Sequence, residues 1–421
     1  MLTAVKPVLQ VLLAVVFMEA GLGILSPLVG LHLASGGAPA TLVGLAFSAY
    51  FGGFLVGTLT CHRLIDRVGH IRAFAVFAAF GAILTLLHLL IRDPYAWLVI
   101  RAVMGYAVAG MFVIVESWLN DKATEDNRGR IFAVYMAVSW AASGISPLAL
   151  NIHDPQGQLL FCLVTIFFAL ALIPMALTRV GNPEIGHRNH FGILRLFKIS
   201  PTGVTVCFGS GMINTSIYAL LPVYTEATGL TAGQLSILLA VVTIAGLVVQ
   251  FPVGYLSDHF GRRPIMLASS AAAAAMATMI AFWPSPSFLV LVLLMFVMDG
   301  VAAPLYALGV GQTNDYVTKK DFVAASAGLL FAWGLGAAIG PTVIGLAMDP
   351  LGANGLFIVC AVGYTTLALF VAIRMLLRPA PSPKEQSDFV AVPVTQGTYG
   401  APELDPRGEY EQFPHRKVDE E

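Results

Sequence analysis

Apolar residues fill the chain in long runs of roughly 20 residues, the length that an α-helix needs to cross the hydrocarbon core of a bilayer. The first run, residues 8–34, is too long for the apolar part of a signal peptide, and no small-residue cleavage site leads from it into a soluble domain. The pattern therefore predicts an all-α membrane protein with twelve transmembrane helices. The expected helices start near Val8, Thr41, Ile71, Pro94, Arg130, Gln158, Pro201, Ala232, Arg263, Ser287, Phe322 and Ala353.

Composition agrees with this pattern. The 421 residues are 57% hydrophobic and 11% charged, with a mean hydropathy of +0.80, whereas water-soluble domains carry about 25% charged residues. The apolar excess must face lipid. The net charge is only -1 and the basic residues are scattered, so nucleic acid is excluded as a partner. The four cysteines lack the CxxC spacing of a metal site, and we expect no metal, cofactor or disulfide framework.

The basic residues predict the orientation in the membrane, because Lys and Arg in short loops stay on the cytoplasmic side. With the N-terminus inside and Arg101 set aside as intramembrane, only Arg92 of the 23 Lys and Arg residues falls in an outer loop. Both termini are therefore expected in the cytoplasm. Residues 379–421 are rich in proline and acidic side chains and show no apolar periodicity, which predicts a disordered cytoplasmic tail.

The chain also repeats itself. Residues 64–69 (LIDRVG) after the second span return as residues 256–261 (LSDHFG) after the eighth span. A repeat of this kind is typical of secondary transporters built from two pseudo-symmetric halves. It predicts a six-helix bundle over residues 1–178, a polar and basic cytoplasmic linker over residues 179–200, and a second six-helix bundle over residues 201–378.

Two motifs then suggest a family. Residues 254–263 (GYLSDHFGRR) resemble, position for position, the loop signature of the major facilitator superfamily, and residues 101–105 (RAVMG) are similar to its fourth-span arginine motif. In the first half, His62 replaces a glycine of the signature, and residues 70–72 (HIR) replace its basic pair. The resemblance covers all twelve spans but not the tail. It implies a monomeric transporter that works by alternating access, with spans one, four, seven and ten around a central cavity.

Within that superfamily, residues 116–118 (ESW) and 127–130 (NRGR) are similar to a bacterial branch of unassigned substrate. The resemblance therefore implies the bacterial cytoplasmic membrane as location, and the bilayer and a small-molecule substrate as partners.

The loop signature has a physical interpretation of its own. An aspartate at the end of one helix, close to an arginine across a tight glycine turn and to the positive N-terminus of the next helix, can latch two helices together. Breaking such a latch would free the halves to rock. The alternative is that these charges only set topology. The predicted pairs are Asp66 with Arg67 or Arg72 and Asp258 with Arg262 or Arg263, and Asp121 and Asp315 are candidate third members of the two latches. The full set of predicted latch residues is Asp66, Arg67, Gly69, Arg72, Asp121, Gly254, Asp258, Gly261, Arg262, Arg263 and Asp315.

Charged residues inside the spans are costly and tend to mark a pathway or a proton relay. Glu19 lies near the middle of span one and Arg101 lies in span four. We expect an ion pair between them that makes proton binding at Glu19 depend on conformation. A static pair that fixes helix register and a role for Arg101 in binding a substrate carboxylate are the alternatives. Glu116 shares a face with Arg101 and belongs either to the cavity or to the inner latch.

In the second half, Asp299 and Tyr306 are seven residues apart in span ten, and Asn214 and Tyr218 are four apart in span seven, so each pair shares a face. These side chains are predicted to contact a small organic solute, although Asp299 is also a candidate coupling acid. Trp140 and Trp333 are expected to pack against lipid.

The resulting prediction is a proton-coupled secondary transporter. Acids in span one with an arginine in span four resemble multidrug exporters, which favours antiport and efflux, although residues 143–147 (SGISP) depart from the superfamily's antiporter motif. Proton-coupled uptake of a metabolite and uncoupled diffusion are the alternatives. An intramembrane enzyme is disfavoured, because Asp299 lacks a GxGD context and no nucleophile–base pair or P-loop is apparent.

Overall fold

The computed structural model describes residues 8–124, 126–178, 192–284 and 286–377, together with residues 386, 389 and 402. These residues form helices and no strands, and twelve of the helices are long and apolar enough to cross a membrane. The prediction of twelve transmembrane helices is therefore confirmed, and their starts differ from the expected ones by at most two residues.

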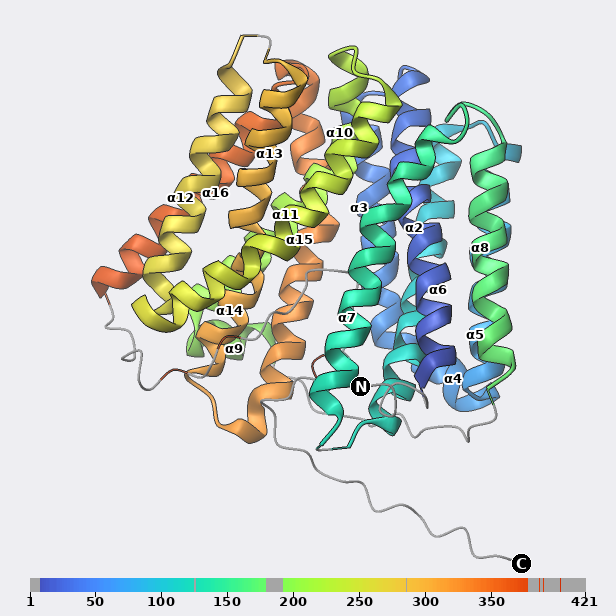
Figure 1. Ribbon diagram of the computed structural model, residues 1–421, viewed down its shortest axis with the longest axis horizontal. Helices are drawn as coiled ribbons and strands as arrows, with labels where there is room; N and C mark the ends of the chain where they lie inside the picture. Colours follow the sequence, from blue (N-terminus) through green and yellow to red (C-terminus); the bar gives the residue numbers. More distant parts are fainter. Residues whose placement is uncertain are drawn as a thin grey trace, which may run out of the picture.

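The first half contains α2 (Leu9–Ser35), α3 (Ala40–Thr60), the short α4 (His62–Val68), α5 (His70–Leu90), α6 (Pro94–Lys122), α7 (Arg128–Ile145) with its 3-10 extension η2 (Ser146–Asn151), and α8 (Leu159–Ala176). The second half contains α10 (Pro201–Ala227), α11 (Ala232–Phe260), α12 (Arg262–Phe282), α13 (Phe288–Ala302), α14 (Pro304–Asn314), η3 (Lys319–Asp321), α15 (Phe322–Leu351) and α16 (Gly355–Leu377). The two sets form two bundles side by side (Figure 1).

Local sequence explains several helix ends. Pro94 and Pro201 begin α6 and α10 at the position where the missing N–H of proline costs nothing. Thr231 and Gln234 form a capping box at the start of α11. Proline also breaks two spans: α7 changes to η2 before Pro147, and the tenth span is divided into α13 and α14 at Pro304.

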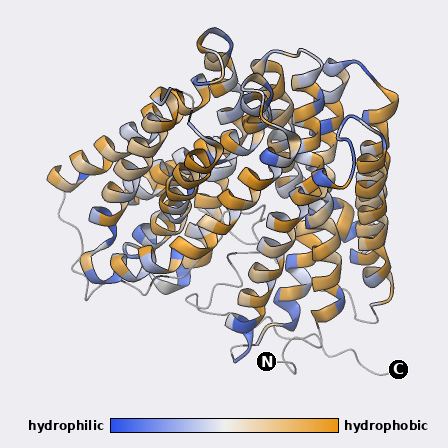
Figure 2. Cartoon of the chain, turned by 45° about the horizontal axis from the view of Figure 1, so that its top comes forward, coloured by the Kyte–Doolittle hydropathy of each residue, from blue (hydrophilic) through white to orange (hydrophobic). Residues whose placement is uncertain are grey.

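The outer faces of the helices carry large apolar side chains. Ile83, Val99 and Leu369 are each more than half exposed. Hydrophobic residues make up most of each helix, and hydrophilic residues lie mainly near the helix ends and in the loops (Figure 2). An exposed apolar surface of this extent is suited to a lipid environment rather than to water.

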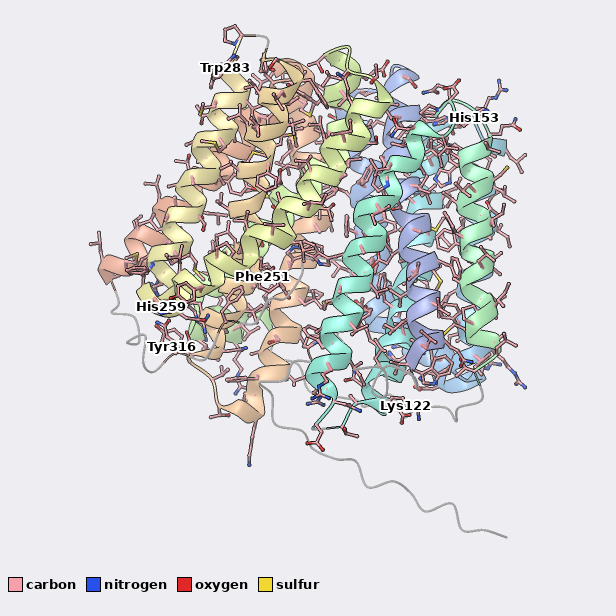
Figure 3. All side chains as sticks on the ribbon, in the orientation of Figure 1. Lys122, His153, Phe251, His259, Trp283 and Tyr316 are labelled. Atoms are coloured by element: carbon pink, nitrogen blue, oxygen red, sulfur yellow. The ribbon has the colours of Figure 1, made fainter. Side chains whose placement is uncertain are left out.

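The hydrogen bonds that join the two halves in the described residues all lie toward one end of the molecule, the end at which α2 finishes. We call this the contact end; His153 and Trp283 mark it, whereas Lys122 and Tyr316 lie at the opposite end, which we call the loop end (Figure 3). The joined pairs are Thr41 with Asp349, Ser48 with Thr342, and Asn151 with Ser236.

Part of the linker is ordered. Residues 179–191 lie outside the described residues, but Ile193–Ile199 forms a short helix, α9, that packs against α10 and α15. Its Leu196 is buried while Leu194 is 78% exposed. The predicted disordered tail also lies outside the described residues, apart from residues 386, 389 and 402.

Candidate functional site

A cavity of about 190 Å³ lies between the two halves. The first half contributes to its wall from α2, α3, α6, α7 and η2, and the second half from α10, α11, α13, α15 and Ala303. Of the predicted site residues, the structure brings together five here. They are Glu19, Arg101, Asn214, Tyr218 and Asp299.

Glu19 is held from the side of α7. Its side chain is 3% exposed, and its Oε2 accepts a hydrogen bond of 2.7 Å from Ser143, whereas Oε1 has no partner in the described structure. The close approach of α2 to the end of α7 depends on Gly23, since a Cβ there would lie 2.0 Å from the Ser146 hydroxyl. A Cβ on Gly23 would also lie 3.1 Å from the Ser143 carbonyl oxygen, so the glycine lets α7 come close enough for the Ser143 hydroxyl to reach the carboxylate.

Arg101 is held by aromatic rings. It is fully buried, its guanidinium carbon lies 4.4 Å from the ring centre of Tyr50 and 5.2 Å from that of Phe47, and none of its three nitrogens has a hydrogen-bond partner in the described structure. Small residues let α3 and α6 approach: a Cβ on Gly105 would lie 1.9 Å from the Tyr50 carbonyl oxygen. The glycine therefore positions the Tyr50 ring beneath the guanidinium.

The predicted ion pair between Glu19 and Arg101 is wrong for this structure, because within the described residues Glu19 accepts a hydrogen bond from Ser143 and Arg101 lies over aromatic rings. Helix geometry explains this. Arg101 lies seven residues from the contact end of the 29-residue α6, and Glu19 lies ten residues from the loop end of the 27-residue α2. At 1.5 Å per residue, their Cα atoms differ in height by roughly 15 Å.

Asp299 is the most isolated ionisable group of the cavity. It is 5% exposed, makes no side-chain hydrogen bond or ion pair in the described structure, and leaves Oδ2 buried and unsatisfied. The nearby α10 side chains are partnered: Tyr218 shares a hydrogen bond of 3.1 Å with Thr243, and Asn214 accepts one of 3.2 Å from Tyr364. Polar groups of α10 and α11 therefore converge with Asp299 on the same wall.

Two predicted site residues lie elsewhere. Tyr306 is not part of the cavity wall. Its ring centre lies 6.5 Å from that of Trp333, which does line the cavity. Tyr306 was expected on the cavity wall together with Asp299, but of the two only Asp299 lines the cavity. Glu116 is fully buried between α6 and α7, where it accepts a hydrogen bond of 3.3 Å from Tyr135.

Several wall residues were not predicted. Trp140 and Trp333 are 8% and 4% exposed and line the cavity, so the expectation that they face lipid is wrong. In an apolar span the face toward the cavity and the face toward lipid carry similar residues, and periodicity does not separate them. Phe47 and Tyr50 were accessible to sequence reasoning, because their spacing places them on one helix face.

The second-half loop, residues 254–263, forms a buried ion pair, but not the predicted one. The Nε of Arg262 lies 2.7 Å from Oδ2 of Asp315 at the end of α14, and both side chains are fully buried. Arg263 donates a hydrogen bond of 2.8 Å to the Tyr316 hydroxyl. The predicted pairing with Asp258 is wrong, since the Asp258 carboxylate accepts instead from the backbone N–H of Phe389, at 3.1 and 3.2 Å. The two arginine contacts lie within the second half, whereas the Asp258 contact joins the second half to the tail.

The first-half loop, residues 62–72, keeps the turn without the ion pair. Gly69 has φ 87° and Gly261 has φ 86°. His70 stands at the position of Arg262, and its Nε2 lies 3.1 Å from the Ser117 hydroxyl. The expected pairing of Asp66 with Arg67 or Arg72 is wrong, because none of the three forms an ion pair in the described part of the chain. Asp121 pairs with its neighbour Lys122 at 2.7 Å.

Comparison with known proteins agrees with this architecture. The family model of the major facilitator superfamily matches residues 11–232 and 202–398. Uncharacterized MFS-type transporters called YcaD, from Salmonella newport and Salmonella typhimurium, are 30% identical over 389 residues, which cover 90% of this chain and 97% of theirs.

Solved structures show the same fold. The nucleoside transporter NupG superposes with a TM-score of 0.71 at 14% identity, over 88% of this chain and 99% of NupG. A bacterial homologue of the human lysosomal transporter Spinster, in an inward-facing and occupied conformation, gives a TM-score of 0.71 at 14% identity, over 90% of this chain and 97% of that one. The chain is a multi-pass membrane transporter and belongs to the major facilitator superfamily.

Proposed function

We propose that the protein exchanges protons for a small organic solute and exports that solute across the bacterial inner membrane. One observation carries this proposal: Glu19 from the first half and Asp299 from the second half are buried in one cavity, and neither is paired with a cation in the described structure. The carboxylates that would exchange protons therefore stand where the solute would pass.

The physical argument concerns the cost of buried charge. An ionised side chain in the middle of a bilayer costs about 2.5–3.5 kcal/mol on insertion scales, and simulations of a charge on an isolated helix give higher values. A bound proton removes that cost, as does a cationic group of a solute. An acid that must be neutralised before it is sealed from water, and that releases its proton when the cavity opens on the other side, links proton movement to the conformational cycle.

The arrangement of the halves supports alternating access. Three hydrogen bonds join the halves toward the contact end. If the N-terminus is cytoplasmic, as the basic residues predict, this conformation is closed to the outside and corresponds to an inward-facing state. The opposite state requires those three bonds to break.

The test uses purified protein in liposomes that enclose a pH-sensitive dye. A panel of drugs, sugars, amino acids and organic acids is first screened by thermal stabilisation, because a ligand that binds the folded state raises its Tm. Each hit is then supplied on one side, and proton movement is recorded. Protons that move opposite to the solute support antiport, protons that move with it indicate uptake by symport, and solute flux without protons overturns coupling.

Two neutral substitutions sharpen the result. Glu19→Gln and Asp299→Asn keep side-chain size but bind no exchangeable proton, and we expect at least one of them to lose uphill transport about 10-fold or more while still exchanging solute down its gradient. Glu226→Gln, at an exposed position at the end of α10, is the matched control. Uphill transport that persists in both cavity variants would exclude these acids as the coupling groups.

A further inference from the structure

Three ionisable side chains share the cavity without pairing with one another. Arg101, Glu19 and Asp299 are all at least 95% buried, and each retains at least one polar atom that has no partner in the described structure. If both acids are ionised, these three groups leave the wall with one excess negative charge. One proton on Glu19 makes the wall neutral, with one cation and one anion still unsatisfied.

The arginine provides the clearest requirement. The rings of Phe47 and Tyr50 stabilise its positive charge, but the faces of these rings offer no acceptor that satisfies five N–H donors. Guanidinium cannot lose its proton in a protein, so the donors need oxygen acceptors. A carboxylate or a phosphate matches the planar fork, because two parallel N–H···O bonds can form at once.

Asp299 poses the opposite requirement on the other half. Among the described residues, none donates a hydrogen bond to its carboxylate and no cation pairs with it, whereas Glu19 already accepts a hydrogen bond from Ser143. An ammonium group supplies both the charge and up to three donors. The aromatic wall of Trp140 and Trp333 is compatible with an apolar body between the two charged groups, and with a cation near the ring faces.

We propose that the transported solute is a zwitterion, with an ammonium group that binds Asp299 and a carboxylate or phosphate group that binds Arg101, joined by an apolar body. This assignment rests on the proposed function only in taking the cavity as the transport site. A plain amine leaves Arg101 without an acceptor, and a plain acid leaves Asp299 without a cation. Either solute leaves an uncompensated buried charge, whereas the zwitterion leaves none.

The proposal also fits proton exchange. The ammonium group of the solute and a proton compete for the carboxylates of the cavity. Binding of the solute therefore displaces a proton, and binding of a proton displaces the solute. Competition of this kind favours antiport. A purely anionic solute would instead bind best together with protons, which favours symport.

The first experiment needs no variant. Thermal stabilisation of the purified protein at neutral pH is titrated with phenylalanine, phenethylamine and 3-phenylpropionate, which share one body, and with leucine, isoamylamine and 4-methylpentanoate, which share another. Phosphoethanolamine and O-phosphotyrosine test phosphate in place of carboxylate. At least one zwitterion should bind about 10-fold or more tightly than its amine and acid partners, because each partner lacks one charge pair. Equal binding by an amine or an acid, stabilisation by sugars alone, or no stabilisation by any zwitterion overturns the proposal.

Variants then assign the two groups. Arg101→Gln should lose the preference for the zwitterion over its amine, and Asp299→Asn should lose the preference over its acid. Arg101→Lys keeps the charge without the bidentate fork and should retain only part of the preference. Arg92→Gln, an exposed arginine between α5 and α6, is the control. If Arg101→Gln retains the full preference of the unmodified protein, the anionic group binds elsewhere and the assignment is wrong.

Binding and coupling fail separately in this design. The stabilisation titrations involve no gradient, so they report the class of solute alone. Zwitterion binding without proton movement in liposomes would overturn the proposed exchange and leave the solute class standing. Proton-coupled transport of a solute with no ammonium or no anionic group would do the reverse.

Discussion

The first-half and second-half loops have nearly the same backbone conformation but different side-chain contacts. Gly69 and Gly261 turn the chain with nearly the same φ and ψ, 87° and 160° against 86° and 154°. After Gly261 comes Arg262, which is always charged and pairs with Asp315 in a fully buried site. After Gly69 comes His70, which contacts the Ser117 hydroxyl and stacks on the Trp118 ring.

This difference indicates that the turn and the ion pair are separable. The turn needs a glycine, and it persists in the half that lacks the arginine. The ion pair needs an arginine at the start of one span and an acid at the end of the following span, and it exists only where both are buried together. In the first half, the corresponding Asp121 faces Lys122, with 27% and 31% of the two side chains exposed.

The largest expected effect comes from breaking the buried pair. Asp315→Asn should lower the free energy of unfolding by about 3–5 kcal/mol, because it removes the carboxylate from a guanidinium that cannot be neutralised. The matched change in the first half, Asp121→Asn, should cost under about 1 kcal/mol, since that pair is exposed. Thermal unfolding in detergent measures both.

A double variant distinguishes pairing from general damage. Arg262→Met combined with Asp315→Leu replaces both charges by apolar groups and should recover most of the lost stability. Equal losses for Asp315→Asn and Asp121→Asn would contradict the difference between the loops.

The next effect should be the same in both halves. Gly69→Ala and Gly261→Ala each place a side chain on a backbone conformation that is essentially restricted to glycine, which costs about 1–3 kcal/mol. At Gly261 the cost is conformational, because the nearest atom to an added Cβ would be 3.7 Å away.

Gly52→Ala is the control for these two variants. Gly52 lies inside α3, and an added Cβ would meet nothing within 4 Å. Alanine should therefore be neutral or stabilising there. A loss of stability in only one of the two turn variants would show that the turns are not equivalent.

A smaller effect should come from the histidine that replaces the arginine. His70→Ala removes a hydrogen bond to Ser117 and a stacked contact with Trp118, whose ring centre is 6.0 Å away. Together these are worth about 1–2 kcal/mol. If His70 does not depend on Asp121, His70→Ala should cost the same with and without the further substitution Asp121→Asn. A departure from additivity above about 0.5 kcal/mol would indicate that the two side chains interact.

The fold was largely predictable from sequence. Long apolar runs give the number and approximate ends of the helices because lipid requires them, and the repeated loop predicts two halves. The breaks at Pro147 and Pro304 were visible as prolines, but a proline inside a span does not by itself reveal whether the helix kinks or divides.

The site was predicted only in part, for two physical reasons. Glu19, Arg101 and Asp299 stand out because a charge inside a span is costly, whereas Trp140 and Trp333 do not stand out, since apolar side chains serve both lipid and cavity. The pairing partners were wrong because proximity in sequence favoured Asp258, four residues before Arg262, while packing of α14 against α12 brings Asp315 closer. Pairing of buried charges is a tertiary property that short motifs do not encode.

The smallest expected effect concerns a contact that only the second-half loop makes. Phe389 packs against Gly254, where an added Cβ would lie 2.2 Å from the phenylalanine ring, and its backbone N–H donates to Asp258. The equivalent position in the first-half loop is His62, which has a side chain in place of this space. Gly254→His should therefore displace Phe389 while changing the stability of the bundle by less than about 1 kcal/mol.

Limited proteolysis detects this displacement more sensitively than a measurement of global unfolding does. Cleavage by chymotrypsin after Phe389 requires the local contact to open, so its rate reports the free energy of that opening and not of the whole fold. We expect faster cleavage in Gly254→His, and the unmodified rate in His62→Gly, which changes only the first-half loop. An unchanged rate in Gly254→His would mean that Phe389 is not held by the glycine, and that the two loops differ in their ion pair alone.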